Sequence, residues 1–160
     1  MGTNVTGALN VSRVAGRKGF IVTFLGDALK GVIVVLLCRY LKISDIITLL
    51  CIFLVIAGHI FPFQLKFKGG KGMSTMLGAF LTYDPLFIIL AIITFAVLFP
   101  FVRKYTITSL FALLLLPLEM QLTGYAWYQV LLILMSVVII AVACRSNLKE
   151  YYQSKNNVRK

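Results

Sequence analysis

Charged residues, and acidic ones above all, are scarce in this sequence. Of its 160 residues, 13% are charged and 60% are hydrophobic, and the mean hydropathy is +0.95. Soluble domains are about 45–50% apolar and about 25% charged, whereas disordered chains have low hydrophobicity. The composition therefore excludes an ordinary soluble domain and a disordered chain, and it indicates a protein with several membrane-spanning helices.

Side chains that hold metals or form disulfide frameworks are also few. The sequence has one histidine, His59, and three cysteines, Cys38, Cys51 and Cys144, which lie in or beside apolar runs. An odd number of cysteines without pairs in loops predicts no disulfide framework, and their spacing fits no metal site. Nothing resembles a Ser-His-Asp triad or paired carboxylates. We therefore expect no metal and no cofactor.

Apolar runs make up most of the chain. A helix needs about 20 largely apolar residues to cross ~30 Å of hydrocarbon. Five runs approach this length, and a sixth, Met73–Thr82, is short. We predict an all-α polytopic membrane protein, a single domain over residues 1–160, with about six transmembrane helices. The predicted spans are Gly19–Cys38, Ile43–Phe63, Met73–Thr82, Asp84–Val102, Thr106–Leu122 and Ala126–Cys144.

The net charge of +11 has a distribution that points to a membrane. Basic residues lie in short clusters between apolar runs instead of forming one basic face, so we expect no nucleic-acid partner. If the chain changes sides at each span, Arg39 and Lys42 lie on one side, Lys30 lies within a span, and the remaining basic residues share the other side. This bias predicts a multi-pass protein of the cell membrane with both termini and its active site facing the cytoplasm. Residues 145–160 are expected to form a basic, loosely ordered cytoplasmic tail on the anionic inner leaflet.

Two aspartates stand at the starts of predicted helices. Asp45 and Asp84 each precede a long apolar run. Aspartate is favoured there because it caps free N–H groups and complements the helix dipole. We expect both residues to act as helix caps.

Two charged residues lie inside the first apolar run. A charged side chain near the centre of a membrane helix costs roughly 2.5–3.5 kcal/mol. Asp27 and Lys30 are three residues apart, so they share a helix face and can pair. An intramembrane ionisable pair indicates a functional site. An ion pair that only holds helices together explains the two residues equally well.

The segment of residues 58–75, GHIFPFQLKFKGGKGMST, combines lysines and glycines directly ahead of a predicted helix start. Glycines expose backbone N–H groups, a helix amino terminus adds partial positive charge, and lysines supply ammonium groups. These are the components of a phosphate cradle, although the spacing is not that of a Walker loop. A basic loop with flexible glycines is the alternative, and both stay open. The residues concerned are Lys66, Lys68, Gly69, Gly70, Lys71 and Gly72.

Two more polar features lie on the same predicted side. His59, at the end of a span, is suited to proton transfer near neutral pH, or it is simply hydrogen-bonded at the interface. The amino-terminal segment of residues 2–13, GTNVTGALNVSR, is rich in small hydrogen-bonding residues and ends in Arg13. Arginine can hold a phosphate through two parallel hydrogen bonds. We interpret these segments as polar loops that converge on an anionic substrate.

Together these segments resemble the acyl-phosphate glycerol-3-phosphate acyltransferase family (PlsY). Residues 58–75 match the family pattern GHxFPxxxxFKGGKGxxT almost residue for residue. Residues 26–31, GDALKG, resemble its LDxxKG helix, and residues 145–149, RSNLK, resemble its RxNxK signature. Ser109 falls where a third, serine-containing motif is expected, with a looser match.

The resemblance implies a membrane acyltransferase of phospholipid synthesis that needs neither acyl-CoA nor a metal. It would transfer a fatty acyl group from acyl phosphate to the 1-hydroxyl of glycerol 3-phosphate, giving lysophosphatidate and inorganic phosphate, among membrane lipids; no oligomeric state is implied. Carried over by motif, the catalytic residues would be His59, Lys71, Ser109 and Asn147. The substrate-binding residues would be Thr3, Gly7, Asn10, Arg13, Asp27, Lys30, Lys68, Gly69, Gly70 and Gly72.

The first motif departs from the family pattern GSGNxGATNxxR. Thr3 keeps a hydroxyl, but Val5 replaces an asparagine and Leu9 replaces a threonine. Losing a buried hydrogen-bond partner costs about 1–3 kcal/mol. The chain also begins at this motif, so six spans stand where the family has seven. These departures leave a second hypothesis, a catalytically weak or inactive paralogue with a binding or regulatory role.

A small anion transporter is a third hypothesis, in which Asp27, Lys30 and His59 line a path. The sequence shows no internal repeat, and many transporter folds have inverted repeats. The transporter is therefore the least favoured of the three.

Overall fold

The described chain is all-helical, as the sequence predicts. The computed structural model describes residues 8–67 and 69–157, without the side chains of residues 8–10, 12–13, 106 and 146–157. Six α-helices and one short 3₁₀ helix occupy these residues. They are α1 (Ala8–Tyr40), α2 (Asp45–Ile60), η1 (Phe63–Leu65), α3 (Met73–Tyr83), α4 (Pro85–Val102), α5 (Tyr105–Leu122) and α6 (Trp127–Asn157).

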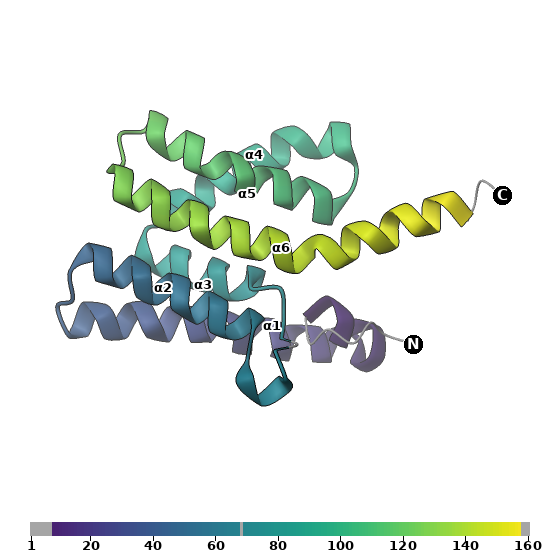
Figure 1. Cartoon of the computed structure of the whole chain (residues 1–160), viewed down its shortest axis with the longest axis horizontal. Coiled ribbons are helices and arrows are strands. Elements are labelled where there is room, and N and C mark those ends of the chain that lie inside the picture. The colour runs from purple at the N-terminus through teal and green to yellow at the C-terminus, as the bar shows by residue number, and fades with distance from the viewer. Residues whose placement is uncertain (1–7, 68, 158–160) are drawn as a thin grey trace.

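The helices lie along one common direction, and successive helices run in opposite senses (Figure 1). The most extensive packing is between α1 and α3, and α4 and α5 form a hairpin that joins the rest through α6 and α3. The start of α1, the end of α6, the α2–α3 connection and the α4–α5 turn lie toward one end, which we call the loop end (Figure 1). The α1–α2, α3–α4 and α5–α6 connections lie at the other, the far end. Arg39 and Lys42 therefore lie at the far end and the other basic clusters at the loop end, as predicted for a chain that changes sides at each span.

Four helices are long and apolar enough to cross a membrane: Val14–Tyr40, Asp45–Leu65, Pro85–Val102 and Trp127–Arg145. Ile107–Leu122 is apolar but shorter. α3 has 11 residues, or roughly 16 Å at 1.5 Å per residue, which is about half the hydrocarbon thickness. The six predicted helices are therefore present, but α3 is too short to cross the membrane by itself.

Both ends of the chain are more helical than the sequence analysis expects. Residues 8–13, expected as part of a polar loop, lie in α1, which is interrupted at Gly16. The backbone of Gly16 has φ 65° and ψ −162°, a conformation that glycine adopts and other residues avoid. At the other end of the chain, the segment expected as a loosely ordered tail continues α6 as far as Asn157.

α1 and α3 touch backbone to backbone through two glycines. A Cβ on Gly31 would lie 2.3 Å from the carbonyl oxygen of Thr75, and one on Gly78 would lie 2.1 Å from that of Ala28. Any side chain at either position would force the helices apart. This close approach fixes the start of α3 beside the middle of α1, where Asp27 and Lys30 lie.

A polar network closes the far end. Asp84 caps α4, as predicted, by accepting a hydrogen bond of 3.0 Å from the Leu86 N–H. Its second oxygen accepts one of 2.7 Å from the Tyr125 hydroxyl. Burial, together with this hydrogen bond, raises the pKa of Tyr125 to about 12. The network thus joins the start of α4 to the α5–α6 connection.

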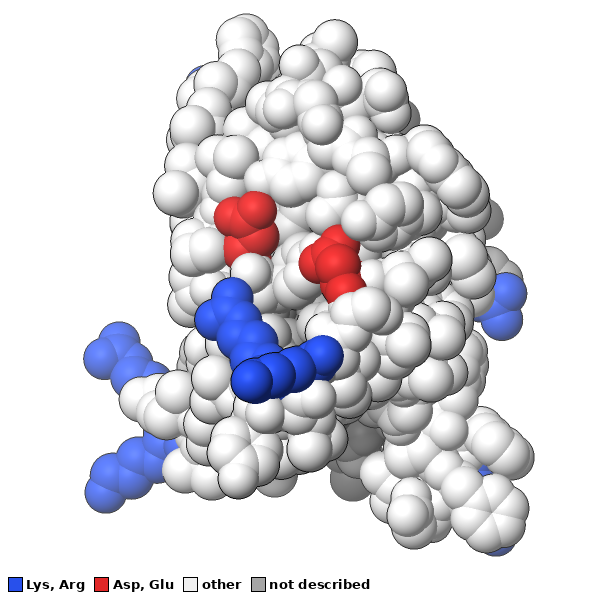
Figure 2. Space-filling model, turned by 90° about the vertical axis from the view of Figure 1, so that its left-hand side faces the viewer, with Lys and Arg blue, Asp and Glu red and all other residues white. Residues whose placement is uncertain are grey.

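Asp45 has a different role from the one predicted. It is the first residue of α2, whose capping position is Ser44. Its carboxyl oxygens accept hydrogen bonds from the hydroxyls of Tyr83 and Tyr128 and from the Gln129 side chain. Asp45 therefore links α2 to α3 and α6. Figure 2 shows acidic and basic side chains next to one another on this end of an otherwise mostly uncharged surface.

Candidate functional site

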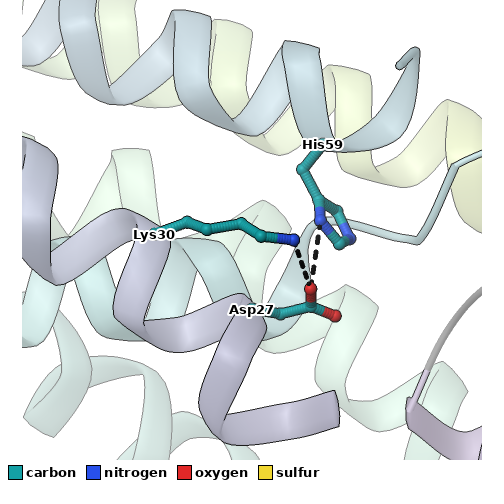
Figure 3. A network of polar contacts seen from close by, with 3 residues as sticks. All are labelled: Asp27, Lys30 and His59. Atoms are coloured by element: carbon teal, nitrogen blue, oxygen red, sulfur yellow. Dashed lines mark hydrogen bonds and ion pairs between the residues drawn. The ribbon is translucent and has the colours of Figure 1, made fainter. Parts of the chain in front are cut away.

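Three ionisable side chains converge at one carboxyl oxygen (Figure 3). The Lys30 Nζ donates a hydrogen bond of 2.9 Å to Asp27 Oδ1, which confirms the predicted pairing. His59 Nδ1 lies 3.5 Å from the same oxygen. Because His59 is the penultimate residue of α2, the pair lies level with the loop-end terminus of that helix. The charges are therefore nearer to this terminus than to the middle of the bundle.

A cavity of about 490 Å³, which we call the polar cavity, opens beside these side chains. The Asp27 side chain is 10% exposed, whereas that of Lys30 is 57% exposed, so the lysine ammonium is the accessible charge. The cavity combines charged, amide and hydroxyl groups with backbone from the glycine segment. Its lining residues are Thr23, Asp27, Lys30, Val55, Gly58, His59, Pro62, Gln64, Leu65, Gly69 and Gly70.

The glycine segment folds back onto the end of α2. The Gly69 N–H donates 3.1 Å to the Ile60 carbonyl, and the Gly70 N–H donates 3.2 Å to the His59 carbonyl. The sequence analysis expects these amides at a phosphate, but the structure uses both within the fold. Gly72 has φ 78° and stands at the capping position of α3. The N–H groups left for an anion are those of the first turn of α3, which have no partner within the helix.

Lys71 lies between the bonded glycines and the start of α3. It is within electrostatic range of the Cys144 thiol on α6. Cys144 precedes Asn147 by three residues, about one helical turn, on the same helix. The fold therefore brings the lysine of the glycine segment close to the α6 segment that carries the RxNxK-like signature.

Ser109 lies near the start of α5. Its hydroxyl donates a hydrogen bond of 2.9 Å to the Tyr105 carbonyl, four residues earlier in α5. With Ser74, in the first turn of α3, it lines a second cavity of about 250 Å³. The other lining residues are apolar: Phe24, Met73, Met76, Leu77, Ile88, Ala91, Ile92, Phe95, Ala112, Leu113 and Leu116. We call this second cavity the apolar groove.

The predicted site residues thus fall into three groups. The structure gathers Asp27, Lys30, His59, Gly69 and Gly70 around the polar cavity, and it places Ser109 in the apolar groove. Lys71 and Gly72 lie in the segment between these two cavities. Thr3, Gly7 and Lys68, and the side chains of Asn10, Arg13 and Asn147, lie outside the described residues.

Two features of the site escaped sequence reasoning. One is the contact between His59 and Asp27, which are 32 positions apart and share no local pattern. The other is the apolar groove, whose α5 wall (Ser109, Ala112, Leu113 and Leu116) follows the i, i+3, i+4, i+7 spacing of one helix face. That spacing is visible in the sequence, but in a membrane helix it does not tell a groove from a packed or lipid-facing surface.

Comparisons with known proteins give a consistent result. A family model described as "Glycerol-3-phosphate acyltransferase" matches residues 1–154. Glycerol-3-phosphate acyltransferase 1 of Desulfitobacterium hafniense (strain Y51) is 33% identical over 159 residues, which cover 99% of this chain and 79% of the relative. The protein of the same name from Bacillus thuringiensis subsp. konkukian (strain 97-27) is 37% identical over 139 residues, covering 87% of this chain and 76% of the relative.

Two solved structures resemble the fold. One is the crystal structure of PlsY (YgiH), an integral membrane glycerol 3-phosphate acyltransferase, in its glycerol 3-phosphate form. It has a TM-score of 0.79 and 25% sequence identity, and the match covers 92% of this chain and 74% of that one. The lysophosphatidic acid form has a TM-score of 0.78, again with 25% identity, and covers 92% and 76%.

Proposed function

The chain belongs to the glycerol-3-phosphate acyltransferase family, and from this we propose that it transfers a fatty acyl group from acyl phosphate to the 1-hydroxyl of glycerol 3-phosphate. The products are lysophosphatidate and inorganic phosphate, and the reaction serves phospholipid synthesis. The observation that carries the proposal is that Lys71 and Gly72 connect the linings of two different cavities: Gly70 lines the polar cavity, and Met73 lines the apolar groove. An acyl phosphate needs both environments, because it has an anionic head and an apolar tail.

The apolar groove suits the donor. Its walls come from α1, α3, α4 and α5, and of its two hydroxyl residues Ser74 belongs to the first turn of α3 and Ser109 to the second turn of α5. An acyl chain in the groove would have its phosphate near the amino terminus of α3. The N–H groups of that turn, which have no partner within the helix, and the ammonium of Lys71 favour a phosphate there.

The polar cavity suits the water-soluble acceptor. Lys30 offers an exposed ammonium, and Asp27 is positioned to hold it. By motif we assign Arg13 and Lys71 to phosphate binding, and Thr3 and Asn147 to the surroundings of glycerol 3-phosphate. Ser109 has the same assignment by motif, and because it lines the apolar groove we place it where the acyl phosphate meets the glycerol 3-phosphate. We assign the remaining first-motif positions, Gly7 and Asn10, and Lys68, to substrate binding. Val5 and Leu9, which replace polar residues of the family pattern, lie in the first motif. Substitutions at these positions should therefore change the binding of glycerol 3-phosphate.

The reaction requires orientation and charge stabilisation more than covalent help. The 1-hydroxyl oxygen forms a bond to the acyl carbonyl carbon, the bond from that carbon to the phosphate oxygen breaks, and the hydroxyl proton leaves with the phosphate product. Negative charge grows on the carbonyl oxygen and on the departing phosphate. Fixed cations and N–H groups stabilise that charge, and holding two substrates together removes much of the entropic barrier.

We further propose that the protein lies in the cell membrane with the loop end facing the cytoplasm. The basic clusters gather at the loop end, and positively charged loops remain on the cytoplasmic side. Glycerol 3-phosphate and acyl phosphate would then reach the Lys71 segment from the cytoplasm and the inner leaflet.

A product assay on the purified protein tests the proposal. The protein in detergent or liposomes, given a fatty acyl phosphate and labelled glycerol 3-phosphate, should form labelled lysophosphatidate. If the folded protein forms no lysophosphatidate, the proposed acyltransferase activity is wrong and the inactive paralogue is the remaining hypothesis. A liposome flux measurement distinguishes the acyltransferase from the anion transporter, because an acyltransferase should not carry glycerol 3-phosphate or phosphate across the bilayer.

A further inference from the structure

Both nitrogen atoms of the His59 imidazole face other residues of the protein. Nδ1 lies 3.5 Å from Asp27 Oδ1, and the His59 side chain is only 8% exposed. On the other side the ring lies against Gly70: a Cβ there would lie 2.1 Å from Nε2, 2.8 Å from Cε1 and 3.1 Å from Cδ2. The three atoms nearest to this missing Cβ all belong to the imidazole. The histidine ring therefore occupies the space that a side chain on Gly70 would need. Figure 3 shows the ring and its carboxylate partner.

The backbone of His59 also binds the glycine segment. The His59 carbonyl accepts the Gly70 N–H, and the next carbonyl, that of Ile60, accepts the Gly69 N–H. Two consecutive residues at the end of α2 thus bind the two glycines before Lys71. Lys71 and Gly72 then lead directly into α3.

We propose that His59 is a positioning residue for Lys71, with Asp27 as the residue that orients its ring. Asp27 on α1 fixes the ring through Nδ1, the ring supports Gly70, and the supported turn sets where Lys71 and the first turn of α3 meet the donor phosphate. This inference rests on the proposed function, since it takes Lys71 as a phosphate-binding group. It gives His59 a role that differs from proton transfer.

A pair of substitutions tests the contact between the ring and the glycine. Gly70→Ala should lower kcat/KM by about 100-fold, because its methyl group displaces the imidazole. His59→Asn keeps an N–H near the position of Nδ1 and removes the ring atoms that face Gly70, so it should lower kcat/KM by about tenfold. The double variant should be about tenfold more active than Gly70→Ala alone, which is the level of His59→Asn. Equal activity of the double variant and Gly70→Ala would overturn the proposal.

Gly69→Ala is the matched control. A Cβ on Gly69 would lie 2.1 Å from the His59 carbonyl oxygen and 2.4 Å from Pro62 Cδ, neither of which is part of the imidazole. His59→Asn should therefore not rescue Gly69→Ala. Rescue of both glycine variants to the same extent would contradict the specific contact.

Two further measurements separate positioning from other roles. If His59 positions the turn, the pH profile of kcat in His59→Asn keeps the wild-type shape at a lower level. If His59 transfers the proton, the limb of the profile that its ionisation sets disappears in that variant, which overturns the proposal. Melting temperatures of the same variants in detergent should show the Gly70–His59 coupling independently of turnover. If the wild-type protein formed no lysophosphatidate, the proposed function would fail, while the melting data would still decide whether the ring supports Gly70.

Discussion

The two ends of the helical bundle use polar side chains in different ways. At the far end, the oxygens of Asp45 and Asp84 accept hydrogen bonds from tyrosines, a glutamine and a helix N–H, all within the fold. At the loop end, Lys30 pairs with Asp27, still has more than half of its side chain exposed, and lines the polar cavity. Carboxylates satisfied by neighbours hold helices together, whereas charges that line a cavity remain available to a substrate. The contrast distinguishes a structural network from a candidate site, although both contain the same residue types.

The largest expected effect is at the loop end. Lys71→Ala should lower acyl transfer by about 10²- to 10³-fold, because removing one preorganised group that stabilises transition-state charge has effects of this size. Lys18→Ala is the control, since Lys18 is an exposed lysine on α1 and should leave turnover nearly unchanged. Initial rates with acyl phosphate and glycerol 3-phosphate measure both. Normal turnover of Lys71→Ala would refute the assignment of this lysine to phosphate.

At the far end the expected effect is on stability. Tyr83→Phe removes a hydroxyl that donates to Asp45 and should lower the free energy of unfolding by about 0.5–1.5 kcal/mol. Tyr40→Phe, at a tyrosine that is 83% exposed on the same end, should change it by less. Denaturation in detergent measures the stability, and the KM for each substrate should stay constant in both variants. A changed KM in Tyr83→Phe would erase the distinction between the two ends.

Restoring the first motif should have a smaller effect on activity. Val5→Asn together with Leu9→Thr returns two polar groups to the segment assigned to the acceptor, and we expect a severalfold increase in kcat/KM for glycerol 3-phosphate. The KM for acyl phosphate should not change. An unchanged acceptor KM would mean that neither position contacts glycerol 3-phosphate in this protein.

The smallest expected effect is a pH dependence at the far end. The pKa of Tyr125 is raised from 10.0 to about 12, so its protonated form is favoured in the folded state. Its contribution to stability is complete below about pH 10 and is lost as pH rises from 10 toward 12. Melting temperatures in detergent should fall less steeply over this interval in Tyr125→Phe than in wild type. Identical slopes would show that this hydroxyl does not contribute.

The sequence predicts the helices better than the contacts between them. Helix limits follow apolar runs bounded by charge, so the predicted Asp84–Val102 and Thr106–Leu122 agree closely with α4 and α5. The Asp27–Lys30 pair is also predictable, because residues at i and i+3 share a helix face. These features depend on local periodicity alone.

The remaining features depend on tertiary packing. The contact of His59 with Asp27, the bonds of the Gly69 and Gly70 amides to α2, and the tyrosine partners of Asp45 all join residues from different elements. Local pattern assigns Asp45 to a cap and the glycine amides to a phosphate, because it cannot include neighbours from other helices. The length of α3 is predicted correctly, since the expected Met73–Thr82 is as short as the 11-residue helix observed. The prediction counts this segment as a crossing because most basic residues then lie on one side, and not because of its length.

The most direct test of the central claim measures two products in one reaction. Purified protein is given acyl phosphate with and without glycerol 3-phosphate, and inorganic phosphate and lysophosphatidate are quantified together. We predict phosphate release that depends on glycerol 3-phosphate and equals the lysophosphatidate formed. Phosphate release without the acceptor, or no release from a folded and inserted protein, would contradict the assignment of this chain as an active glycerol-3-phosphate acyltransferase.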